Sequence, residues 1–130
     1  MKIAIFVVGE HFAGKSSTIN DFLKPRLGIP NKNKFIFKSE YKGFIYSQSF
    51  EECKANIESR LDKIKQYDIL IISARPRWEK PSDLNELIAG VTRRGFTYQE
   101  FFITKGIETE ATYYEHQALA ILGLLDNLLV

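Results

Sequence analysis

The chain has 130 residues, of which 45% are hydrophobic and 26% are charged, and its net charge is +2. This length supports one buried core, so we expect a single domain over residues 1–130. The apolar content excludes a disordered chain, and the small net charge does not by itself indicate a polyanionic partner. A lone cysteine, Cys53, excludes an intrachain disulfide and a cysteine-built metal site, which favours a cytoplasmic protein.

Neither apolar end of the sequence predicts a membrane span. The first run covers only residues 3–8 before Gly9 interrupts it, and the last, residues 118–130, contains Asp126 and Asn127. A span needs about 20 apolar residues. We therefore expect no membrane association. We interpret the leucine-rich C-terminal run as a buried amphipathic helix that also offers a surface for self-association.

Five short apolar segments predict strands. The expected strands are residues 2–8, 34–40, 43–48, 68–74 and 98–104. The first and fourth are nearly continuous apolar runs, typical of central strands buried on both faces. Tyr41 and Lys42 separate the second strand from the third, and Gly43 follows, which predicts an early β-hairpin.

Helical patterns with capping signals fill the gaps between the strands. The expected helices begin at Lys15, at Ser49, at Ser82, and at either Thr109 or Thr112. Pro25 should end the first helix near Lys24. Ser49 and Glu52 match a capping box, so one amphipathic helix is expected from there to about Ile64. The alternation of strands and helices predicts an α/β fold with a mostly parallel five-stranded sheet and flanking helices.

One motif in the sequence indicates chemistry. The motif GxxxxGK[ST] is matched at every fixed position, by Gly9, Gly14, Lys15 and Ser16. The candidate nucleotide-binding residues also include those at its variable positions, Glu10, His11, Phe12 and Ala13. The two glycines let the backbone curl so that its N–H groups point at phosphate oxygens, and the following helix adds its positive N-terminal dipole. Lys15 would contact the β- and γ-phosphates, Ser16 would bind Mg²⁺, and Ser17 would reach the α-phosphate.

At these residues the chain resembles the P-loop NTPase superfamily. The resemblance implies a three-layer α/β P-loop fold that binds ATP or GTP together with Mg²⁺. It also implies that the loop follows the carboxyl end of the first strand, with the nucleotide lying across the switch point of the sheet. The specific match covers the first 25 residues, and the remainder agrees through its alternation of strands and helices.

P-loop enzymes normally carry an acid at the end of an apolar strand, where it holds Mg²⁺ or polarises the attacking water. The expected strand at residues 68–74 has Ser73 near its end and no acid there. The alternative carboxylates are Glu10, Glu40, Glu51 and Glu52. We favour Glu40 as the metal ligand, because we expect it at the carboxyl end of a parallel strand.

Two branches of the superfamily compete for the remaining residues. Pro76 and Arg77 match the end of a segment in adenylate-kinase-like nucleotide kinases, where the arginine binds the acceptor phosphate. On that resemblance, Arg75 or Arg77 would supply charge to the transition state or to an acceptor phosphate. Arg93 and Arg94 are further candidates for gripping a phosphate.

The second branch is GTPase-like. Residues 14–20 resemble the GKSS-x-x-N start of many GTPases. The guanine-reading [NT]KxD would fall at residues 104–107, but its fourth position is Ile107 rather than aspartate, and no DxxG follows the hairpin. We therefore expect ATP in preference to GTP.

A basic and aromatic stretch follows the motif. Residues 24–42 hold six basic residues against Glu40 alone. Basic residues that alternate with aromatic ones suit single-stranded nucleic acid, and the same charge suits a phosphorylated or anionic small substrate. The simpler interpretation is an edge hairpin whose lysines prevent edge-to-edge pairing and whose aromatic side chains belong to the core.

Taken together, these features predict a Mg²⁺-dependent P-loop protein that binds ATP and has NTPase or kinase-like phosphotransferase activity. Lys15, Arg75 and Arg77 would carry the catalytic charges. The alternatives are a nucleotide-gated interaction module with little turnover, and a GTP-binding protein that lacks the usual guanine motif.

Overall fold

The protein is described by a computed structural model that covers residues 2–9, 14–53, 56–103 and 110–129. A five-stranded sheet forms its centre, with strand order β2-β3-β4-β1-β5. The strands are β1 (Ile3–Val8), β2 (Lys34–Phe37), β3 (Tyr41–Tyr46), β4 (Ile69–Ala74) and β5 (Thr97–Phe102). The expected α/β architecture with a mostly parallel sheet is confirmed, since only β2 runs antiparallel to its neighbour.

Strands β1 and β4 lie at the centre of the sheet because their side chains are apolar on both faces. Every residue of both strands is buried, and the two pair in parallel from Ile3 opposite Ile69 to Val8 opposite Ala74. Side chains alternate between the two faces of a strand. Ile5 and its alternate neighbours therefore pack into one core, while Phe6 and its alternate neighbours pack into the other.

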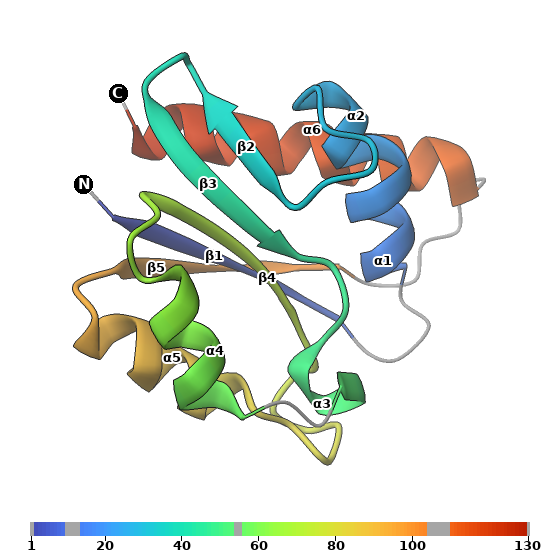
Figure 1. The fold of residues 1–130 in the computed structure, drawn as a ribbon. Helices are drawn as coiled ribbons and strands as arrows, with labels where there is room; N and C mark the ends of the chain where they lie inside the picture. Colours follow the sequence, from blue (N-terminus) through green and yellow to red (C-terminus); the bar gives the residue numbers. More distant parts are fainter. Residues whose placement is uncertain (1, 10–13, 54–55, 104–109, 130) are drawn as a thin grey trace.

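Two layers of helices cover these two cores (Figure 1). The first layer contains α1 (Lys15–Ser17), η1 (Thr18–Leu23), α2 (Lys24–Arg26) and α6 (Glu110–Leu128). The second contains α3 (Phe50–Cys53), α4 (Ile57–Ile64) and α5 (Leu84–Arg93). The helix after β1 thus covers one face, while the helix after β4 covers the other. This arrangement makes the gap between the ends of β1 and β4 the switch point of the sheet.

The early hairpin forms, but its turn lies earlier than expected. Lys38, Ser39 and Glu40 connect β2 to β3, and the first two have positive φ angles of 54° and 57°. Gly43, which suggested the turn, is a residue of β3 opposite Phe35. A Cβ at Gly43 would lie 2.1 Å from the Phe35 ring, so the glycine serves cross-strand packing.

The first helical segment continues past its expected end. It runs without a break through Arg26, because η1 is a π-helix in which the Lys24 N–H donates to the Ile19 carbonyl. A proline ring clashes with the carbonyl four residues earlier in an α-helix, and the wider π geometry relieves that clash. Pro25 is therefore accommodated inside the helical segment.

The expected single helix from Ser49 is wrong. Two helices, α3 and α4, occupy this segment, and Asn56 caps the second by accepting the Ser59 N–H at 2.9 Å. The Ser49 hydroxyl is buried without a hydrogen-bond partner, so it caps nothing. The α5 prediction is confirmed, including Gly95 with φ of 88° after its end. The last helix begins by Glu110, which excludes the later start at Thr112.

Within the described part of the chain, none of the helices is both long and apolar enough to cross a membrane.

Candidate functional site

The phosphate-loop motif lies at the switch point between β1 and β4. Gly9 directly follows β1, and its N–H donates to the Ala74 carbonyl at the end of β4, at 3.2 Å. Gly14 precedes α1 with a left-handed φ of 94°, a conformation that glycine adopts without strain. Glu10, His11, Phe12 and Ala13 lie outside the described residues.

Lys15 and Ser16 begin the helix at this point. Lys15 is buried, and its ammonium group donates to the Gly9 carbonyl across the loop. The Thr18 N–H donates to the Gly14 carbonyl at 2.9 Å, which closes the first helical turn. The exposed Ser16 hydroxyl lies 3.5 Å from the Ser47 carbonyl at the end of β3. A positive charge and a hydroxyl therefore meet where β1, β3 and β4 end.

Buried polar atoms without a hydrogen bond gather at the same edge of the sheet. Among the described residues, five side-chain atoms are buried with no hydrogen bond. They are Thr18 Oγ1, Ser49 Oγ, Glu51 Oε1, Ser73 Oγ and Arg75 Nε. All five lie at, or in the segments following, the carboxyl ends of β1, β3 and β4. Unsatisfied buried polar groups destabilise a fold, so their concentration at one edge makes that edge the candidate functional site.

Glu51 is the buried carboxylate of this cluster. It lies in the first turn of α3 and is only 9% exposed. Its Oε2 accepts the Asp83 N–H at 2.6 Å, while Oε1 has no partner. The neighbouring Ser82 hydroxyl donates to the Arg75 carbonyl at 3.1 Å. These bonds hold the carboxylate beside the segment that follows β4.

Ser73 occupies the strand-end position where an acid was sought. Its side chain is fully buried, and by alternation along β4 it lies on the same face as Ile69 and Ile71, which η1 covers. Its hydroxyl has no hydrogen-bond partner. β4 therefore contributes a polar group to the site, but no negative charge.

Glu40 does not lie at the carboxyl end of a parallel strand, the position on which its assignment to the metal was based. Glu40 is exposed in the turn that precedes β3, at the amino end of the parallel strands, because β2 runs in the opposite direction. The register of β3, β4 and β1 separates Glu40 from Gly9 by nine residue positions, or roughly 30 Å along the strands. Because β2 is antiparallel to β3, the carboxyl end of β2, where Glu40 follows, lies at the amino ends of the other strands.

The two proposed catalytic arginines differ in position. Arg75 follows β4 directly, lies level with Gly9 and is 17% exposed, with its Nε 3.6 Å from Glu79 Oε1. Arg77 donates to Asn85 and Glu100, each at 2.7 Å. Glu100 is level with Phe6, about 10 Å back from the loop. Arg75 therefore borders the loop, while Arg77 is bound away from it.

Arg93 and Arg94 belong to an ion-pair cluster between α4 and α5. Arg94 donates to Glu58 and to Asp62, both at 2.8 Å, and Arg93 also pairs with Glu58. These arginines lower the pKa of Glu58, chiefly through the hydrogen bond from Arg94. The cluster lies at the start of β5, at the opposite edge from the loop, so these guanidinium groups serve helix packing.

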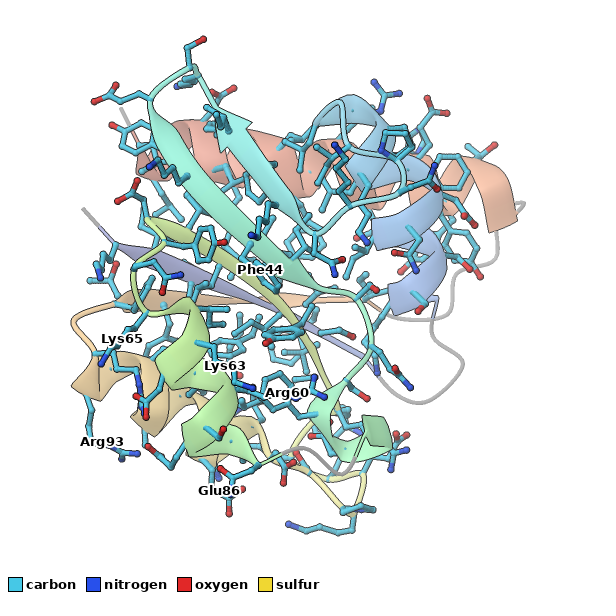
Figure 2. The ribbon with its side chains drawn as sticks, viewed as in Figure 1. Phe44, Arg60, Lys63, Lys65, Glu86 and Arg93 are labelled. Carbon is cyan, nitrogen blue, oxygen red and sulfur yellow. The ribbon has the colours of Figure 1, made fainter. Side chains whose placement is uncertain are left out.

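The basic, aromatic stretch is largely structural. Phe35 of this stretch is buried in the core. Phe44 and Tyr46, which follow it on β3, pack against one another with ring centroids 5.0 Å apart. Arg60 extends from α4 (Figure 2), and its guanidinium carbon lies 5.5 Å from the centre of the Tyr46 ring. Lys24 is also buried and donates to Asn33 at 2.8 Å, and burial lowers its pKa. Few of these groups are therefore available to stack on nucleic acid.

No group of three or more His, Cys, Asp or Glu side chains that could hold a metal ion occurs within the ranges that the structure describes.

In comparisons with protein-family models, curated proteins and solved structures, nothing matches this chain.

Proposed function

We propose that the protein is a P-loop nucleotide-binding enzyme that transfers the terminal phosphoryl group of a Mg²⁺-bound nucleoside triphosphate to water or to a small acceptor. The observation that carries this proposal is the position of the motif. Its first glycine follows a buried central strand, its second has a left-handed φ, and its lysine begins a helix at the switch point. This is the context that the motif requires to act as a phosphate cradle.

The residues around the loop have complementary roles in this proposal. Lys15 exchanges the Gly9 carbonyl for the β- and γ-phosphates, and the amide groups of residues 14–17 contribute hydrogen bonds and the helix dipole. Ser16 contributes a hydroxyl to the Mg²⁺ that arrives with the nucleotide. These groups stabilise the charge that spreads over the transferred phosphoryl group.

Glu51 replaces Glu40 as the proposed acid of the site. It combines a buried position with an unpartnered carboxylate oxygen, and it follows the strand whose end approaches Ser16. In that position it can orient the attacking water or accept a proton from an acceptor hydroxyl. Arg75 borders the loop and supplies charge for the transition state or for an anionic acceptor.

A second candidate function follows from Ser73. Because β4 ends without a carboxylate, the protein is alternatively a binding module that holds nucleotide and hydrolyses it slowly, with α6 engaging a second copy. Turnover separates the two candidates. A rate that rises sharply when a phosphate acceptor is added supports the enzyme, while tight binding with slow hydrolysis supports the module.

Isothermal titration of Mg-ATP and Mg-GTP into the protein tests the proposal. We expect both to bind and Lys15→Ala to weaken binding by at least tenfold, since it removes a charge-assisted hydrogen bond worth about 1.5–3 kcal/mol. Lys63→Ala is the matched control, because it removes an exposed lysine from α4, on the other helical layer (Figure 2). The Lys63→Ala variant should bind both nucleotides with the affinity of the wild type.

The proposal fails if the wild-type protein binds neither nucleotide at millimolar concentration. It also fails if Lys63→Ala and Lys15→Ala weaken binding equally, because that result would indicate attraction by overall charge alone.

A further inference from the structure

The ring of Tyr114, on α6, lies against Gly14 of the loop. A Cβ built on Gly14 would be 2.2 Å from Tyr114 Cε1 and 2.9 Å from its hydroxyl oxygen. No side chain larger than hydrogen fits between them. An aromatic ring one hundred residues away in the sequence therefore lies directly beside the residue that precedes the phosphate-binding lysine.

Neighbouring contacts hold this ring in place. Its centroid is 6.4 Å from that of Phe22 on η1 and 5.9 Å from that of Tyr113. Arg26 and Glu115 form an ion pair at 2.6 Å, which links the end of the loop helix to α6 one residue beyond the ring. Tyr114 is half-buried, so part of its surface remains accessible to a ligand.

The geometry of the loop indicates where a nucleoside would lie. Ser16, the proposed Mg²⁺ ligand, faces the end of β3 through its contact with Ser47. A cation that bridges the β- and γ-phosphates holds them on that side. β5 lies on the opposite side of β1 from β3 and β4, and Tyr114 lies near the start of α6, the helix that follows β5. The α-phosphate and nucleoside would therefore leave the loop toward Tyr114.

We propose that Tyr114 is the residue on which the nucleobase stacks, and that this contact binds purine nucleotides without distinguishing adenine from guanine. The inference rests on the proposed function. Aromatic stacking tolerates different bases because each has a π-face, whereas hydrogen bonding to base edges discriminates among them. This lack of discrimination is consistent with the sequence, in which Ile107 stands where the guanine-reading motif has its aspartate.

The test compares Mg-ATP with Mg-tripolyphosphate, which carries the phosphates but no base. Tyr114→Leu keeps an apolar side chain against Gly14 and removes the π-face. We expect it to weaken Mg-ATP and Mg-GTP each about tenfold and to change tripolyphosphate affinity less than twofold. Tyr114→Phe should retain wild-type affinity for all three. Tyr98→Ala, which removes an exposed ring near the start of β5, is the control for loss of a tyrosine.

The outcomes separate this inference from the function on which it rests. If Tyr114→Leu leaves nucleotide affinity unchanged, or weakens nucleotide and tripolyphosphate equally, the ring is not a base-stacking surface. The proposed function still stands in both cases. If wild-type protein binds neither tripolyphosphate nor nucleotide, both proposals are overturned. Should Tyr114→Leu fail to fold, equal wild-type affinities for Mg-ATP and Mg-tripolyphosphate would still refute a base contact.

Discussion

At the scale of single residues, the site combines a sequence motif with groups that only the fold brings together. The motif identifies Gly9, Gly14, Lys15 and Ser16 without a structure, because the spacing of these residues is itself the chemical signal. Glu51 has no comparable signal. Its carboxylate accepts a hydrogen bond from the backbone N–H of Asp83, which lies in a different segment of the chain.

Glu51→Gln tests the role of this carboxylate. The amide oxygen of Gln can still accept the Asp83 N–H, so folding and Mg-ATP affinity should remain within about threefold of the wild type. Loss of a catalytic acid or base reduces turnover by roughly 10²–10⁴-fold. We expect phosphate release, measured at saturating Mg-ATP, to fall by at least tenfold. Unchanged turnover would remove Glu51 from the reaction.

Sequence reasoning missed Tyr114 for a physical reason. Its contact with Gly14 joins the two ends of the chain, and periodicity in a sequence reports only neighbours within an element. The opposite error occurred at Glu40, whose local sequence suggested a strand end. The direction of β2 determines at which end of the sheet Glu40 lies. That direction is set by the pairing of β2 with β3, which the local sequence does not specify.

At the scale of elements, the central strands and α5 were the most predictable parts of the fold. β1 and β4 are continuous apolar runs, and such runs are buried wherever they pair. Predictions of element boundaries were wrong where glycine or proline has a role other than ending an element. Gly43 served packing against Phe35 rather than a turn, and Pro25 was accommodated by a π-helix rather than ending the helix.

The start of α5 carries an electrostatic cost that pH should reveal. Burial raises the pKa of Asp83 above its ordinary value of 3.8, and the Glu86 carboxylate raises it further. The folded state then binds its proton more tightly than the unfolded state does. The contribution of Asp83 protonation to the free energy of unfolding is fully present below pH 3.8. It is lost as the pH rises through the raised pKa of Asp83 in the folded state.

Asp83→Asn removes this charge while keeping the backbone N–H that Glu51 accepts. We expect the variant to unfold at a higher urea concentration than the wild type at pH 7, with the advantage shrinking toward zero below pH 4. Urea midpoints at the two pH values provide the measurement. An advantage of equal size at both would show that the ionisation of Asp83 is not its source.

At the scale of the whole molecule, the two positively charged features lie at opposite ends of the sheet. The loop follows the carboxyl end of β1, while Lys38 and Lys42 lie on the hairpin near its turn, roughly 30 Å away along the strands. Lys38 pairs with Asp126 of α6 at 2.8 Å. The lysines of the hairpin are thus close to the motif in sequence but distant from it in space. We therefore expect a phosphate ligand to bind at the loop and not at the hairpin.

The most direct test of the central claim is a nuclear magnetic resonance titration of ¹⁵N-labelled protein with Mg-tripolyphosphate. The amide groups of residues 14–17 should show the largest chemical-shift changes, because they are the donors expected to face the phosphates. The amides of Lys38 and Lys42 should move little. The account is contradicted if the hairpin amides shift most and those of the loop remain unchanged.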